Sequence, residues 1–146
     1  MTTSDVVVRE GWDREHEDGL MRLFAEQWWT ADRTLDQTRD VIRGSSAIFR
    51  AVHESTGELV GFARVLTDGV FLALLLDVMV ADAWRGRGVG ALLMDAVTSH
   101  QMIDQVESFE LVCQPQLSPF YSRWGFTDRV GTSGLMRRTA RANFVS

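Results

Sequence analysis

The sequence contains no lysine, one cysteine, one tyrosine and two prolines, so all fifteen of its basic residues are arginines. The absence of lysine excludes a P-loop lysine and a Schiff-base nucleophile. The lone Cys113 excludes an internal disulfide and a thiolate zinc cluster. His16, His53 and His100 also lack the spacing of metal ligands. We therefore expect no metal site.

Long hydrophobic runs are missing as well. The longest unbroken apolar stretch, residues 70–76, is far shorter than the roughly 20 residues that a membrane helix needs. The first five residues have neither the basic nor the apolar region of a secretory signal. We therefore expect a cytoplasmic protein without a membrane partner.

Basic residues are outnumbered, giving a formal net charge of −5, and the arginines are scattered rather than clustered. This distribution disfavours a nucleic-acid partner, whose phosphates need a basic surface. The 146 residues are 45% hydrophobic, which is enough for one core. We expect a single domain over residues 1–146.

The spacing of apolar residues predicts strands interleaved with helices. A helix capped by Asp13 is expected to reach Trp28, and a glycine-rich turn precedes a longer helix. The order predicts a mixed α/β (α+β) sheet of about seven strands, mostly antiparallel with a parallel central pair, flanked by about four helices. The last two strands should form a closing hairpin, whose exposure favours a homodimer. The predicted strands are residues 6–8, 47–54, 59–67, 70–81, 109–113, 126–130 and 135–139; the other predicted helices are 35–43, 89–100 and 120–124.

The glycine-rich turn, RGRGVG at residues 85–90, opens the longer helix. Unpaired amides and a partial positive charge gather at a helix N-terminus, and glycines let a phosphate approach them. The segment is therefore a candidate pyrophosphate site. One alternative is a tight turn that needs glycine only for positive φ. Another is the dinucleotide fingerprint, with Gly86, Gly88 and Ala91, which the preceding antiparallel strands disfavour.

Two segments carry a family resemblance. Residues 78–90, VMVADAWRGRGVG, resemble the acyl-CoA-binding signature of the GNAT acetyltransferase superfamily, and residues 119–126, PFYSRWGF, resemble its late FYxxxGF element. The order of the predicted strands around both motifs agrees with that family. Residues 61–69 and 77–80 are also similar to a bacterial small-amine branch. The resemblance implies a GNAT-like sheet and acetyl-CoA as co-substrate, its pantetheine arm lying between the central strand and its parallel neighbour.

The resemblance also implies which residues bind the cofactor. Main-chain groups of Val78, Met79 and Val80 would pair with the amides of the arm, in the manner of an added strand. The glycine loop would hold the diphosphate through its amides, with added charge from its arginines. The residues implied in this loop are Arg85, Gly86, Arg87, Gly88, Val89, Gly90 and Ala91.

Acetyl transfer to an amine needs a neutral amine, a polarised thioester carbonyl and a protonated leaving thiolate. Tyr121 lies where the family places a hydroxyl donor, and a phenol of pKa near ~10 can protonate a thiolate. It is the candidate general acid, unless it merely packs beside Phe120. A backbone amide of Val80 or Met79 would polarise the carbonyl.

Two acids are candidates for the general base. Asp77 interrupts the apolar central strand, where burial with a raised pKa would let it deprotonate the amine or a bridging water. The alternative for Asp77 is a structural ion pair with Arg64. Glu110, on the neighbouring strand, is the second candidate because some relatives use an acid there.

The acceptor pocket is expected where the loop between the first two helices crosses the gap, with Trp28, Trp29, Asp32 and Arg33 near the thioester. Two adjacent tryptophans cannot both face the core of one helix, so one should be exposed or line a pocket. Trp29 could instead cover the sheet edge. Aromatic faces with Asp32 and Asp77 suit a cationic amine.

The sequence thus predicts direct transfer of acetyl from acetyl-CoA to the primary amine of a small molecule in a ternary complex. Acetylation of a protein lysine or amino terminus is an alternative within the same chemistry. A non-catalytic acyl-CoA sensor is an alternative of another class.

Overall fold

The computed structural model describes residues 5–145 as a sheet flanked by helices. The strands are β1 (Val6–Glu10), β2 (Ala47–His53), β3 (Glu58–Thr67), β4 (Leu72–Val80) and β5 (Ser108–Leu111), in the order β1-β2-β3-β4-β5. The first four strands pair antiparallel in sequence order, and β5 pairs parallel with β4. The predicted mixed, mostly antiparallel sheet with one parallel pair is therefore confirmed, but in the described sheet this pair lies at an edge and not at the centre.

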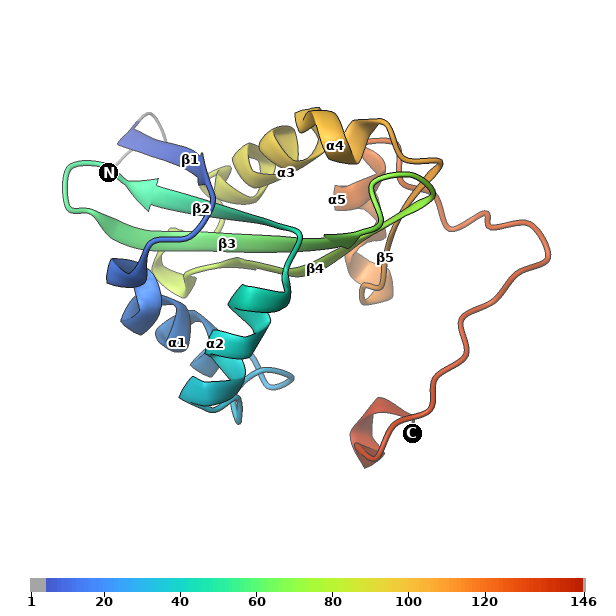
Figure 1. Cartoon of the computed structure of the whole chain (residues 1–146), viewed down its shortest axis with the longest axis horizontal. Helices are drawn as coiled ribbons and strands as arrows, with labels where there is room; N and C mark the ends of the chain where they lie inside the picture. The colour runs from blue at the N-terminus through green and yellow to red at the C-terminus, as the bar shows by residue number, and fades with distance from the viewer. Residues whose placement is uncertain (1–4, 146) are drawn as a thin grey trace. The chain divides into compact units, whose positions relative to one another are not determined.

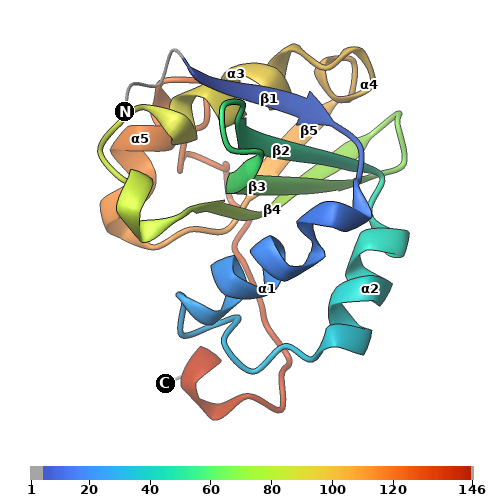
Figure 2. The same ribbon diagram turned by 90° about the vertical axis from the view of Figure 1, so that its left-hand side faces the viewer.

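Helices cover both faces of this sheet (Figure 1). α1 (Glu17–Ala25) and α2 (Leu35–Gly44) lie on one face, and α3 (Val89–Ser99) and α4 (Gln101–Asp104) lie on the other, as the turned view in Figure 2 also shows. Phe62 of β3 packs with Phe24 of α1. A Cβ added to the preceding Gly61 would instead lie 3.1 Å from a methyl carbon of Leu93 in α3. Because neighbouring strand residues point to opposite faces, we call the side reached by Phe62 the α1 face.

The starts of the first two helices follow local capping rules. Asp13 accepts a hydrogen bond from the Glu15 amide and begins the 3-10 turn η2 (Arg14–His16) that leads into α1. Thr34 and Gln37 form a capping box at the start of α2. α1 ends at Ala25, so Trp28 lies beyond the helix, contrary to the predicted helix reaching that residue.

The connection from β4 to β5 is the predicted helical crossover. It contains the 3-10 turn η3 (Asp82–Trp84), the glycine loop, α3 and the short α4. α3 buries Val89, Leu93, Met94 and Val97 against the sheet. α4 was not predicted, because its four residues are too few to show a helical period; the His100 side chain caps it by accepting from the Met102 amide.

The chain forms two compact units, of which the first ends at Val112 and the second begins at Cys113. The second unit holds the 3-10 turns η4 (Pro115–Leu117) and η5 (Ala142–Phe144) and the helix α5 (Ser118–Ser122). α5 ends at Ser122, before the predicted end at residue 124, and Gly125 lies in the turn that follows, with a φ of 88°. The expectation of one acetyltransferase domain over residues 1–146 stays a prediction.

The predicted closing hairpin differs from the structure. Residues 126–130 and 135–139 are not strands, so the sheet has five strands in the described part of the chain rather than about seven. A two-stranded hairpin is marginal unless one face is buried. Val130, Leu135 and Met136 are 58%, 69% and 94% exposed, so this segment has no buried face to hold it. The expected homodimer remains a prediction without the hairpin that favoured it.

Candidate active site

The glycine loop lies between η3 and α3, where the sequence places it. Gly86 and Gly88 have φ of 73° and 84°, in the left-handed region that side chains other than glycine rarely adopt. Residues 85–88 are all exposed. The loop therefore turns the chain into α3 while leaving its own backbone open to solvent.

The amides at the start of α3 are suited to an anion. The first intrahelical bond runs from the Leu92 amide to the Gly88 carbonyl, at 3.1 Å. The amides of Val89, Gly90 and Ala91 precede that bond and have no acceptor within the helix. Together with the helix dipole, these donors favour a negatively charged group.

The two arginine side chains of the loop contact residues of β4 and η3. Arg85 forms an ion pair with Asp82 at 3.1 Å, and its Nε donates to the Val80 carbonyl at 3.4 Å. The Arg87 guanidinium lies 5.3 Å from the centre of the Trp84 ring. Trp84 is buried and in turn lies 4.8 Å from the ring of His53. This support could not be predicted from the sequence, because His53 is distant from Trp84 in the chain and belongs to no motif.

β4 has an unpaired edge at its end, shortly before η3 and the glycine loop. β4 pairs with β5 from Leu72 to Leu75, whereas β4 itself continues to Val80. Its opposite edge pairs with β3 as far as Val80. No strand of the described chain pairs with Val78, Met79 or Val80 on the β5 side. The pantetheine gap that the resemblance implies would lie at this edge, and it stays a prediction.

Asp77 sits at a bulge in β4, next to that open edge. Phe62 pairs with Met79 and Arg64 pairs with Leu76, so a single residue of β3 faces both Asp77 and Val78. Asp77 has a φ of 52° and is the only residue other than glycine with positive φ among those described.

Two arginines bind the Asp77 carboxylate. Arg33 Nη1 and Nη2 donate to Oδ2 and Oδ1 at 2.7 and 3.0 Å. Arg64 Nε donates to Oδ2 at 2.7 Å. Arg33 belongs to the loop between α1 and α2, so the structure brings together one predicted acceptor residue and one predicted catalytic residue.

The pKa of Asp77 does not suit a general base. Burial alone would raise it, but the hydrogen bonds and charges of Arg33 and Arg64 outweigh burial and lower the pKa below its ordinary value. The raised pKa expected for a base is therefore absent. The alternative of a structural ion pair with Arg64 is present, with Arg33 as an unforeseen second partner.

Glu110 presents a different environment. It lies on β5 opposite Leu74, and the Ser108 hydroxyl donates to its carboxylate at 2.9 Å. Its side chain is exposed. Leu74 and Leu66 form a pair on the face that carries Arg64, so the register places Glu110 on the α1 face.

The remaining acceptor residues lie in the loop after α1. Trp28 is 51% exposed, as expected for at least one of the two tryptophans, and its ring lies 6.0 Å from that of Trp29 in an edge-to-face arrangement. Asp32 is also exposed. Glu26 of the same loop accepts from the Asp82 amide at 3.0 Å, a link that the sequence did not indicate. Burial, with a contribution from the Asp82 carboxylate, raises the pKa of Glu26.

Tyr121 belongs to the second unit, in α5. Its side chain is buried, and burial raises its pKa to about 12, with a smaller contribution from Cys113. The ring of Phe126 lies 6.2 Å away. At neutral pH this phenol stays protonated, so it can serve as an acid but not as a base.

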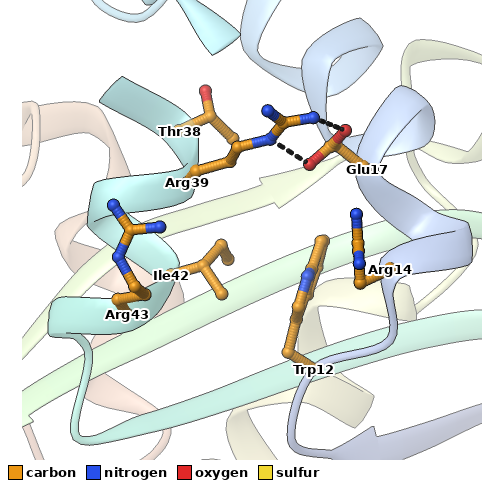
Figure 3. A pocket seen from close by; sticks show the side chains of 7 residues that line it. All are labelled: Trp12, Arg14, Glu17, Thr38, Arg39, Ile42 and Arg43. Carbon is orange, nitrogen blue, oxygen red and sulfur yellow. Dashed lines mark hydrogen bonds and ion pairs between the residues drawn. The ribbon is translucent and has the colours of Figure 1, made fainter. Parts of the chain in front are cut away.

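A separate pocket of about 280 Å³ lies between α2 and the segment leading into α1 (Figure 3). Across it, Arg39 donates to Glu17 at 2.9 and 3.0 Å. None of the predicted site residues lines it. The lining residues are Trp12, Arg14, Glu17, Thr38, Arg39, Ile42 and Arg43.

The described residues show no candidate metal cluster and no candidate membrane span. Within residues 5–145, no group of three or more His, Cys, Asp or Glu residues is arranged to hold a metal ion. Every helix in this range is too short or too polar to cross a bilayer.

The comparisons with known proteins agree with the fold. The family model of the acetyltransferase (GNAT) domain matches residues 13–135. A GNAT-family protein of Xanthomonas campestris pv. campestris is 31% identical with a TM-score of 0.77, covering 95% of this chain and 97% of that one. An uncharacterized N-acetyltransferase of Porphyra purpurea is 32% identical over 70% of this chain and 61% of its own length.

An aminoglycoside N-acetyltransferase in complex with CoA shares the fold, with a TM-score of 0.67, 17% identity and coverage of 93% of this chain and 95% of that one. The chain spans about half the length of the curated relatives it matches. The family match extends over most of the sequence and includes both motifs. The chain therefore belongs to the GNAT acetyltransferase family.

Proposed function

We propose that this chain transfers an acetyl group from acetyl-CoA to the primary amine of a small molecule, within a ternary complex. One observation carries the proposal: the open edge of β4 at residues 78–80 is followed, after η3, by a loop and by the first turn of α3, whose amides precede the first intrahelical bond. The first feature can pair with the amides of a pantetheine arm, and the second can hold a diphosphate. Acetyl-CoA contains both groups in the same order.

The cofactor contacts are assigned mainly to the backbone. Val78, Met79 and Val80 bind the arm, and an amide of Met79 or Val80 polarises the thioester carbonyl. The amides of residues 86–91 bind the diphosphate. Arg85 and Arg87 add positive charge beside the proposed diphosphate site.

Tyr121 is the proposed general acid. Its pKa of about 12 keeps the phenol protonated at neutral pH, so it can deliver a proton to the leaving thiolate. Replacing Tyr121 with Phe removes only the hydroxyl. We expect turnover to fall about 10²-fold, a typical loss for a general acid, while CoA affinity measured by calorimetry stays within twofold.

Phe120→Leu is the matched control for Tyr121→Phe, because it removes aromatic packing from the same helix and leaves the hydroxyl in place. Equal losses of turnover in the two variants would assign Tyr121 to packing alone.

Glu110 is the proposed general base, acting directly or through a water molecule. It is exposed on the α1 face, whereas Asp77 is occupied by two arginines. In Glu110→Gln we expect the acidic limb of the kcat/KM profile to disappear, because that limb reports the ionisation of the base. An unchanged acidic limb would remove Glu110 from this role.

The proposed reaction is tested by supplying acetyl-CoA with a panel of small primary amines and detecting the free thiol of CoA, alongside calorimetric titration with CoA. We expect one CoA bound per chain and thiol release with a subset of amines. CoA binding without thiol release on any amine would indicate a sensor. Release only with lysine peptides or peptide amino termini would indicate a protein acetyltransferase.

A further inference from the structure

The Asp77 cluster joins three separate parts of the first unit. Asp77 comes from β4, Arg64 from β3 and Arg33 from the loop between α1 and α2. The Asp77 side chain is 6% exposed, that of Arg64 is 13% exposed and that of Arg33 is 23% exposed. All three hydrogen bonds are between 2.7 and 3.0 Å. The cluster is therefore a tight, largely buried link rather than a surface ion pair.

Arg33 is fixed on its other sides as well. Its guanidinium carbon lies 4.5 Å from the centre of the Phe24 ring at the end of α1. Its backbone amide donates to the Thr30 carbonyl at 3.1 Å, and the buried Thr30 hydroxyl donates to the Phe24 carbonyl at 2.6 Å. The segment from residue 30 to residue 33 is thus tied both to α1 and to Asp77.

Asp77 immediately precedes the proposed cofactor-binding residues 78–80. The bulge and the positive φ place the turned backbone immediately before the open edge at residues 78–80. Asp and Asn are the side chains that best tolerate the left-handed conformation. The Asp77 carboxylate therefore links loop residues 28–33 to the open edge of β4 at residues 78–80.

The charges in the cluster exclude two simpler roles for Asp77. Both of its oxygens accept hydrogen bonds from guanidinium groups, so neither is available as a base. Two arginines against one aspartate also leave the cluster with a formal charge of +1, so Asp77 offers no negative charge to a cationic amine.

We propose that Asp77 and Arg33 are positioning residues, which hold the acceptor loop of residues 28–33 against the β4 bulge so that the amine meets the thioester. This inference rests on the proposed acetyl transfer. It assigns Asp77 to acceptor binding through Arg33, and it assigns neither residue to proton transfer.

The test uses Arg33→Ala, Arg33→Lys and Asp77→Asn in the full chain. We expect Arg33→Ala and Asp77→Asn to raise the KM for the amine about tenfold, the size of a typical buried charged contact. The affinity for CoA in calorimetry should stay within twofold, and Asp77→Asn should keep the acidic limb of its pH profile. Arg33→Lys should recover part of the loss, because a lysine retains one hydrogen bond to Asp77 but cannot bind both oxygens.

Arg39→Ala is the matched control. Arg39 also binds a carboxylate through two nitrogens, that of Glu17, and so links α2 to α1 outside the acceptor loop. It should leave the KM for the amine unchanged. Loss of the acidic limb in Asp77→Asn, or an unchanged KM in a folded Arg33→Ala variant, would overturn the proposal.

Amide hydrogen exchange separates this proposal from the proposed function and does not depend on turnover. If no amine is acetylated by the unmodified protein, the proposed function fails, but Arg33→Ala should still speed exchange over residues 26–34 while Arg39→Ala does not. If Asp77→Asn does not fold, hydrogen exchange in Arg33→Ala still tests the link between Arg33 and Asp77. Unchanged exchange over residues 26–34 in Arg33→Ala would contradict the link itself.

Discussion

The glycine loop and the Asp77 cluster lie at opposite ends of the short segment from residue 77 to residue 91, and they are built in opposite ways. The loop is exposed and offers main-chain amides, so its geometry depends on glycines with positive φ and on the start of α3. The cluster is buried and depends on three charged side chains from three elements. One end of the site is therefore backbone chemistry, and the other is side-chain chemistry.

This difference determines how each end responds to change. A main-chain site tolerates side-chain substitution and fails only when the backbone conformation is altered. A buried ion cluster fails when any partner is removed, because the remaining charges lose their compensation. Substitutions in the two regions should therefore affect different quantities, CoA affinity in the loop and folding stability in the cluster.

The largest expected effect is on stability, from Asp77→Asn. Removing the only negative charge leaves Arg33 and Arg64 facing each other in a largely buried site. We expect the free energy of unfolding, measured by urea denaturation, to fall by about 3 kcal/mol. Asp40→Asn, which breaks the exposed pair between Asp40 and Arg43, should cause no measurable change. Equal losses of unfolding free energy in Asp77→Asn and Asp40→Asn would contradict the claim that the buried cluster is the stabilising one.

The same ion cluster predicts a pH dependence. The folded-state pKa of Asp77 is below that of an unfolded aspartate, near ~3.9, so its contribution is fully present above that value. The contribution is lost as the pH falls through the lowered folded-state pKa. The difference in unfolding free energy between the unmodified protein and Asp77→Asn should be constant from pH 7 to about pH 5, then shrink in acid. A difference that grows in acid would contradict the lowered pKa.

The next effect is on CoA affinity, from Gly88→Val. A branched side chain at a φ of 84° is strained by roughly 1–2 kcal/mol and distorts the start of α3. We expect the Kd for CoA to rise at least about tenfold, equivalent to 1.4 kcal/mol. Gly11→Val is the control, because Gly11 has a φ of 94° and open space around it but lies outside the loop. A rise in Kd in the control would point to general strain.

The smallest effect is expected from Arg87→Ala. This change removes one exposed charge and its stacking on Trp84, leaving the amides in place. We expect the Kd for CoA to rise only about threefold, in keeping with exposed charge contacts. Arg22→Ala, an exposed arginine of α1, should cause no change. A loss of CoA affinity in Arg87→Ala as large as that in Gly88→Val would show that CoA binding by the loop depends on side chains.

The same division explains what could be predicted from the sequence. The loop is local: its glycines, the helix that follows and the strand before it are consecutive in the chain, so pattern alone places them. Strands β1 to β4 follow from alternating or continuous apolar runs between clear turns. Asp77 is noticeable as an acid in an apolar strand, and Arg64 is within reach across the sheet.

The remaining features depend on contacts between distant residues. Arg33 lies 44 positions from Asp77, and no period or motif links them. The His53 ring packs against the Trp84 ring only in the folded chain, because the two residues are distant in sequence. The predicted strands at 126–130 and 135–139 show the opposite error: their residues suit a strand, but propensity does not form a hairpin when no surface buries its apolar side.

The most direct test compares CoA with pantetheine, which has the arm but lacks the diphosphate and the adenosine 3′-phosphate attached to it, by calorimetric titration of the unmodified protein. If the amides of residues 86–91 hold the diphosphate, pantetheine should bind at least about tenfold more weakly than CoA, a loss of 1.4 kcal/mol or more. Equal affinity for the two compounds, or no heat with CoA at all, would contradict the assignment of this loop.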